Sequence, residues 1–201
     1  VRGGGRGPGG ASGREQRAGE QTAFKTWTET WRTGTGGRVR IWHPSGATVE
    51  LTLFGAHIVS WRTPSALLPG GVERLWMSSL SALDGSAPIH GGVPIGGVPI
   101  AWPQFADVGA LPLHGFARER QWVLVGPSSR GGVAESLAGT DAAVAEFSLR
   151  SDEQVANGSW RQPPTEPFPW SFTLRYRIEL CENSLRLQLR VQHEGVPGGR
   201  A

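Results

Sequence analysis

The sequence predicts an all-β protein. Short stretches in which every second residue is apolar recur along the chain, and glycine- and proline-rich stretches separate them. The clearest pair is 172–180 and 185–191, which flank the turn-type residues Cys181 to Ser184 and are typical of a hairpin. No stretch shows a convincing helical period. Many short strands with turn signals between them favour an antiparallel β-sandwich.

The other expected strands can be taken in chain order. Two strands flank the turn His43 to Gly46, and in the second of them Val49, Leu51 and Leu53 alternate with polar residues. A third follows the break at Gly55, and residues 68–73 are expected to form a loop. The complete set of expected strands is 39–41, 47–53, 57–62, 122–125, 143–149, 172–180 and 185–191.

Length and composition predict one domain with long flanking segments. The chain has 201 residues, including 30 glycines and 15 prolines, so much of it must be turn or loop. Residues 1–37 are rich in Gly and Arg and contain little that could build a core, so we expect them to be disordered. Residues 38–195 should form the sandwich domain, and 196–201 a disordered tail.

Charge and cysteine content limit the partners. The formal net charge is only +3 and the arginines are scattered. Residues 2–7 resemble an RGG-type segment, but the tail lacks aromatic residues that could stack on bases, so we expect no nucleic acid partner. No apolar run reaches the roughly 18 residues of a membrane span.

Cys181 is alone, which indicates a reducing compartment and a cytoplasmic protein. The arginine-rich start resembles part of a transit peptide, which leaves a plastid as the alternative.

One irregular segment concentrates polar groups of three kinds. Gln104, His114 and Arg118 place a carboxamide, an imidazole and a guanidinium within about fifteen residues. Glycine and proline interrupt this segment, so it cannot be a plain helix or strand. Such a segment suits a pocket for a polar small molecule. The alternative is a turn-rich surface loop in which the histidine caps a backbone carbonyl.

A series of motifs occurs between residues 55 and 122, and several motifs in a fixed order are more specific than any one of them. The motifs, in chain order, are Gly55–Trp61, Leu75–Ser79 with Leu83–Gly85, Pro88–Ile95, Ala101–Phe105, Leu111–Arg118 and the following Trp122. Together they resemble the motifs of the glucose-6-phosphate 1-epimerases, the hexose-6-phosphate mutarotases of the aldose 1-epimerase superfamily.

The resemblance implies a fold and a set of binding residues. The fold would be the antiparallel galactose mutarotase-like supersandwich, and the partner a hexose 6-phosphate, with no cofactor or metal. Arg118 would bind the 6-phosphate or a sugar hydroxyl, or else form a surface ion pair with Glu119 or Asp107. His114 would bind the sugar near its ring oxygen. Gln104 would bind a hydroxyl or pin the loop backbone.

Three departures from the family pattern alter the expected site. His90 stands where the family has a phosphate-binding arginine, and it could bind phosphate only when protonated, so binding should weaken as the pH rises. Leu113 replaces the glutamine of the family's "QHGFAR" motif. The sequence Gly-Gly-Val-Pro-Ile occurs twice in tandem over residues 91–100.

The resemblance also implies that the sandwich is incomplete. The family's catalytic histidine and glutamate lie beyond the segment that His193 ends, and we find neither in these residues. The catalytic residues are therefore unassigned. Two hypotheses follow. One is an epimerase that interconverts the α and β anomers of hexose 6-phosphates by acid/base ring opening. The other is an inactive fragment or pseudoenzyme that binds sugar phosphates.

Overall fold

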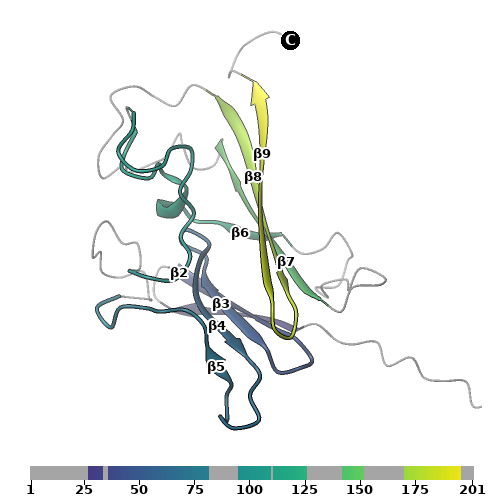
Figure 1. Cartoon of the computed structure of the whole chain (residues 1–201). Coiled ribbons are helices and arrows are strands. Elements are labelled where there is room, and N and C mark those ends of the chain that lie inside the picture. The colour runs from purple at the N-terminus through teal and green to yellow at the C-terminus, as the bar shows by residue number, and fades with distance from the viewer. Residues whose placement is uncertain are drawn as a thin grey trace, which may run out of the picture.

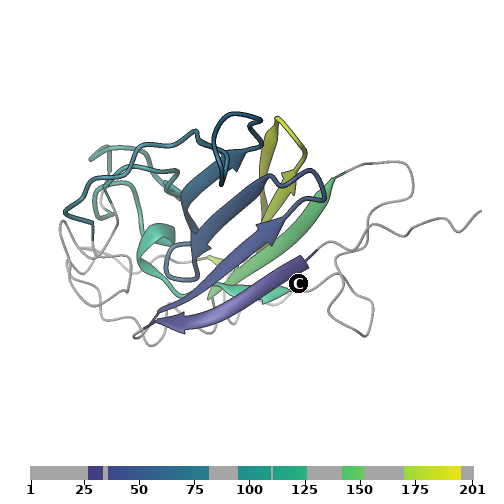
Figure 2. The same cartoon turned by 90° about the horizontal axis from the view of Figure 1, so that it is seen from below.

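The computed structural model describes residues 27–33, 36–81, 95–109, 111–125, 142–151 and 170–195. They form two antiparallel sheets packed face to face, as Figures 1 and 2 show. The first sheet has the order β1 (Trp27–Thr33), β2 (Gly36–Trp42), β3 (Thr48–Thr52), β4 (His57–Thr63), β5 (Val72–Glu73). The second has the order β6 (Val123–Val125), β7 (Ala143–Arg150), β8 (Ser171–Leu180), β9 (Leu185–Gly195). The prediction of an all-β fold is confirmed.

The alternating pattern of the sequence determines which side chains meet between the sheets. In β2 and β3, every second residue is fully buried, while the residues between them face the outside of the first sheet. The same alternation in β8 turns its apolar side chains toward the first sheet. The fully buried members of this shared core include Val39, Ile41, Val49, Leu51, Ile58, Phe147, Leu174 and Ile178.

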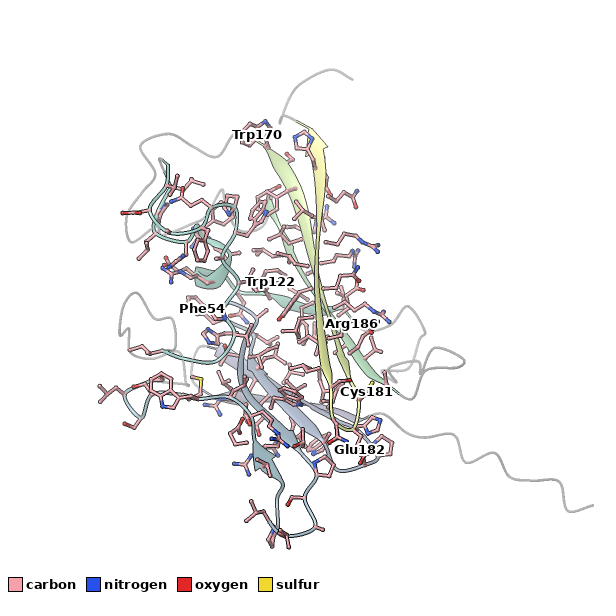
Figure 3. The ribbon with its side chains drawn as sticks, viewed as in Figure 1. Phe54, Trp122, Trp170, Cys181, Glu182 and Arg186 are labelled. Carbon is pink, nitrogen blue, oxygen red and sulfur yellow. The ribbon has the colours of Figure 1, made fainter. Side chains whose placement is uncertain are left out.

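The aromatic residues near the middle of the chain belong to this core. Trp122 is 1% exposed and lies between the two sheets (Figure 3). Its indole N–H donates to the carbonyl of Ala117 at 2.9 Å, which satisfies the one polar atom of a buried tryptophan. Trp102 packs against Phe116 and Phe172. Both tryptophans therefore serve packing.

The structure corrects the expected start of the domain. β1 lies inside residues 1–37, which we expected to be disordered, and it pairs with β2 from Trp27↔Trp42 to Thr33↔Gly36. Its sequence, WTETWRT, consists largely of aromatic and β-branched residues, which favour strands. The glycine-rich composition of the whole segment concealed that local signal. Residues 1–26 and 196–201 lie outside the described residues.

Two smaller features complete the fold. The expected loop 68–73 ends in the two-residue strand β5, which pairs with β4. A single turn of 3-10 helix, η2 (Ala117–Glu119), precedes β6. Within the described ranges, no helix combines the length and the apolar character needed to cross a membrane.

Candidate functional site

The segment that carries Gln104, His114 and Arg118 is a loop closed at its base by the core. The backbone N–H groups of Phe116 and Ala117 both donate to the carbonyl of Trp102, at 2.9 and 3.2 Å. The rings of Trp102 and Phe116 meet edge to face, with centroids 5.3 Å apart. The first and last parts of the loop are therefore held together at the edge of the sandwich, in the teal region beside η2 in Figure 1.

The tight closure of this loop depends on one glycine. Gly115 has φ +72°, a conformation that side chains with L chirality rarely adopt. A Cβ atom there would collide with the carbonyl group of Trp102 and also lie 2.7 Å from the nitrogen of Pro103. The sequence therefore needs glycine at this position for the two ends of the loop to approach each other.

His114 is fixed from both its backbone and its ring. Its N–H donates to the carbonyl of Ala106 at 2.8 Å, and its Nδ1 accepts the N–H of Ala106 at 3.0 Å. Both residues have positive φ, 65° for His114 and 58° for Ala106, and the reciprocal bonds hold them there. Because Nδ1 accepts a hydrogen bond, the proton of the neutral ring is on Nε2. Nε2 is thus the ring atom that can donate to a ligand.

Gln104 connects the two halves of the loop. Its amide nitrogen lies within hydrogen-bonding distance of the carbonyl oxygens of Ala106, Leu111 and Pro112, at 3.2, 3.0 and 3.3 Å. These contacts correspond to the loop-pinning role, the alternative to hydroxyl binding in the sequence interpretation. Because its amide nitrogen already donates to the backbone, the atom of Gln104 that is left to bind a ligand is the carbonyl oxygen. This oxygen can accept a hydrogen bond.

Arg118 is the middle residue of η2, and only 15% of its side chain is exposed. Its Nη2 donates to the carbonyl of Leu113 at 2.8 Å and lies 3.8 Å from a carboxylate oxygen of Glu119. The ion pair with Glu119 is therefore present but long. The Nε atom is buried and has no hydrogen-bond partner among the described residues. A buried guanidinium donor without an acceptor is costly.

Backbone contacts bring a distant segment of sequence against Arg118. The N–H of Gly55 donates to the carbonyl of Arg120 at 2.7 Å, and a Cβ at Gly55 would collide with the carbonyl oxygen of Arg118. Gly55 has φ +78°, so the turn between β3 and β4 needs glycine for this close approach. β4 then begins with His57, which is 1% exposed.

His57 is the residue of this site that the sequence interpretation did not select. Burial is the main cause that lowers its pKa, and the positive charge of Arg118 lowers it further, against the opposing effect of a hydrogen bond to the backbone. Its Nε2 lies 2.7 Å from the carbonyl of Gly96, so Nε2 carries the proton and donates. His57 is therefore a neutral buried imidazole behind Arg118. Its position at the start of the "GAHIVSW" motif was the only signal for it in the sequence.

The predicted site residues can now be placed. Gln104, His114 and Arg118 all bond to the backbone of residues 106–113 and so share one loop. His90 lies outside the described residues. Exposed apolar side chains from the same loop surround the polar groups, namely Phe105, Val108 and Leu113. In the part of the chain that the structure describes, no three His, Cys, Asp or Glu side chains gather to hold a metal ion.

Comparisons with known proteins identify the family of this chain. The sequence pattern of the family described as aldose 1-epimerase matches residues 37–197. The chain belongs to the aldose 1-epimerase family. The match includes both sheets apart from β1, and it contains the whole 101–118 loop.

Individual relatives match part of the chain. A protein of Escherichia coli strain K12 named "Putative glucose-6-phosphate 1-epimerase" is 40% identical over 86 residues, 41% of this chain and 25% of that protein. Proteins with the same name are 39% identical over 85 residues in Salmonella typhimurium, covering 41% and 25%, and 37% identical over 73 residues in Cenchrus ciliaris, covering 36% and 19%. The match thus spans about a quarter or less of each relative's length. No solved structure matches the chain significantly.

Proposed function

We propose that this chain binds a hexose 6-phosphate in the 101–118 loop and contributes to the interconversion of its α and β anomers. The observation that carries the proposal is the placement of Arg118, whose guanidinium is anchored through Nη2 to the carbonyl of Leu113, in the same loop that fixes the ring of His114. A phosphate oxygen would accept from the guanidinium at the 15% of the side chain that is exposed. The names of the relatives supply the substrate class.

Interconversion of the anomers requires a base and an acid from the protein. A base takes the proton from the C1 hydroxyl while an acid protonates the ring oxygen, the ring opens, the C1–C2 bond rotates, and the ring closes on the other face. Nε2–H of His114 is a donor at fixed orientation, and we assign it a hydrogen bond to the sugar near the ring oxygen. Arg118 orients the phosphate end of the same molecule. We assign no general base to the described residues.

His57 supports this arrangement without touching the ligand. Because its pKa is lowered, its ring stays neutral at a pH where a free histidine would begin to charge. A neutral ring does not repel the guanidinium of Arg118. The proposed binding loop therefore has beside Arg118 an imidazole that stays neutral near neutral pH.

Binding without catalysis is the second candidate function. It is favoured by the hydrogen bonds of Gln104 and His114, since the amide of the first and Nδ1 of the second are occupied in holding the loop. These hydrogen bonds give the loop the rigidity of a binding surface. Such a protein would retain the affinity for sugar phosphates while leaving the anomer ratio to relax at the uncatalysed rate.

Two measurements on the same sample separate the candidates. Magnetisation exchange between the anomeric protons of glucose 6-phosphate reports catalysis, and calorimetric titration with the same compound reports binding. Faster exchange in the presence of the chain supports the epimerase. Saturable binding with unchanged exchange supports the binding protein, and the absence of both contradicts the proposal.

A further inference from the structure

The outer face of the first sheet carries a hollow that takes no part in the loop site. Its volume is about 720 Å³, within the range of roughly 300–1,000 Å³ that is common for small-molecule sites. It lies on the side of β2–β5 that faces away from the second sheet, and its floor and rim include Arg40, Trp42, Glu50, Ser60, Glu73 and Trp76. The residues of the 101–118 loop do not line it.

Strand register explains how the polar side chains come together. One row across the sheet pairs Arg40 with Glu50, and Glu50 with Ser60. The next row pairs Thr48 with both Trp42 and Arg62, and Arg62 with Glu73. Neighbouring side chains in such rows point to the same face of a sheet. The alternation that fills the core with apolar residues therefore also assembles this polar face.

The charged groups of the hollow neutralise one another. Nε of Arg40 donates to Glu50 at 2.7 Å, and the two side chains form an ion pair. Nε of Arg62 lies 3.4 Å from Glu73, which also accepts the hydroxyl of Ser60 at 2.6 Å and the N–H of Trp61 at 3.0 Å. Burial would raise the pKa of Glu73, but these hydrogen bonds and Arg62 outweigh it and lower the pKa.

Two tryptophans add aromatic surface at the same place. Trp76 is 69% exposed, and its ring lies against the backbone of Gly96, where a Cβ would be 3.0 Å from ring atom Cε3. The indole thus contacts the chain near Cε3 while most of the side chain remains open. The guanidinium carbon of Arg40 lies 5.4 Å from the ring centroid of Trp42, which holds that ring by a cation–π contact.

We propose that this hollow is a second binding site and that its ligand is an uncharged sugar, either free or as the end of a glycan. A pyranose presents a face of C–H groups that stacks on an indole and a rim of hydroxyls that both donate and accept. The paired arginines and glutamates supply donors and acceptors at fixed positions with no net formal charge. The arginines of the hollow already neutralise carboxylates, so they would attract a phosphate only weakly. The hollow therefore suits a neutral ligand, whereas the loop that carries Arg118 suits an anionic one.

The test uses the 201-residue chain and methyl β-D-glucopyranoside, with the methyl glycosides of galactose and mannose as a panel. These probes lack a phosphate and cannot interconvert their anomers. Titration is followed through the indole N–H resonances of Trp42 and Trp76, each assigned by Trp→Phe substitution. We expect a saturable shift of both resonances with a dissociation constant in the range of about 1–100 mM.

Two variants and one competitor make the result decisive. Trp76→Ala should weaken binding by roughly fivefold to tenfold, because it removes one stacking contact. Trp170→Ala is the matched control, since Trp170 is 47% exposed and lies at the far end of β8 (Figure 3). It should leave binding unchanged. Saturating glucose 6-phosphate should not displace the glycoside, which separates this site from the proposed loop site.

Three results would overturn the proposal. The first is the lack of a saturable indole shift with all three glycosides. The second is equal affinity of wild type and Trp76→Ala. The third is displacement of the glycoside by glucose 6-phosphate, which would place the sugar in the Arg118 loop. Failure of glucose 6-phosphate to bind anywhere would contradict only the loop assignment, because the glycoside titration does not depend on it.

Discussion

The 101–118 loop and the outer hollow of the first sheet use their polar side chains in opposite ways. In the loop, Gln104, His114 and Arg118 bond to the backbone, so the groups that could bind a ligand also hold the loop in shape. In the hollow, arginines and glutamates pair with each other above a sheet that already has its core on the other side. Changes in the loop should therefore affect stability and binding together, whereas a change at the exposed Trp76 of the hollow should affect binding alone.

The largest effect is expected from replacing Gly115, the glycine at which the loop closes. Gly115→Ala should destabilise the fold by on the order of 3–5 kcal/mol, because a methyl group would collide with the backbone of Trp102 in a conformation that alanine avoids. Chemical denaturation of the variant measures this loss. Gly46→Ala is the matched control, since Gly46 has φ +94° with open space around it and should cost only about 1–2 kcal/mol. Equal losses in the two variants would contradict the close approach at Gly115.

The next effect concerns ligand binding. Arg118→Ala should weaken the binding of glucose 6-phosphate by about 100-fold, because a hydrogen bond to a charged group contributes roughly 1.5–3 kcal/mol. Calorimetry measures the affinity, and thermal denaturation verifies that the variant is folded. Arg186→Ala, on the exposed outer side of β9, removes an arginine whose side chain is 80% exposed and should leave the affinity unchanged. An Arg118→Ala variant that is folded and binds as well as wild type would remove Arg118 from the site.

A smaller effect is expected on the pH dependence of stability, and it comes from His57. Its pKa in the folded chain is below the ordinary value of 6.5, chiefly because of burial, so the unfolded chain takes up the proton first as the pH falls. The contribution of His57 to stability is complete above pH 6.5 and is lost as the pH falls from there toward the lowered pKa. We expect the free energy of unfolding to drop between roughly pH 7 and pH 5 because of this group.

The matched variant for the pH effect is His57→Gln, which keeps a donor for the carbonyl of Gly96 and does not titrate. Denaturation curves of both proteins over the same pH range show the difference. The variant should have the flatter profile. Parallel profiles would mean that other groups cause the pH dependence.

The smallest effect should come from Leu113, which is 50% exposed beside Arg118. Leu113→Gln would restore the glutamine of the family motif and add a donor and an acceptor at the rim of the loop. We expect affinity for glucose 6-phosphate to rise by roughly threefold, the effect of one neutral hydrogen bond. Calorimetry against wild type measures it, and lower affinity would show that the apolar rim itself contributes to binding.

The sequence predicted the fold well and selected three residues of the candidate loop, for reasons that particular residues show. Alternation in 172–180 predicted β8, because a half-buried strand must alternate. β1 was missed because its Trp and Thr residues lie within a glycine-rich segment. Gln104, His114 and Arg118 could be selected because they lie close together in the sequence.

His57 could not be selected in the same way. It reaches Arg118 only through the turn at Gly55, which lies more than sixty residues from η2 along the chain. The partners of Gln104 are backbone carbonyls, and a sequence does not show which carbonyls a side chain will meet. The hollow of the first sheet was likewise hidden, because it depends on the pairing register of β2 with β3 and β4.

The most direct test of the account is a titration of the isotopically labelled chain with glucose 6-phosphate, followed through backbone amide and indole resonances. The account predicts saturable shifts in residues 104–118 and at Gly55, with the indole resonances of Trp42 and Trp76 unchanged. Shifts confined to those two indoles, or no saturable shift in the loop, would contradict the assignment of the sugar-phosphate site to Arg118 and its loop.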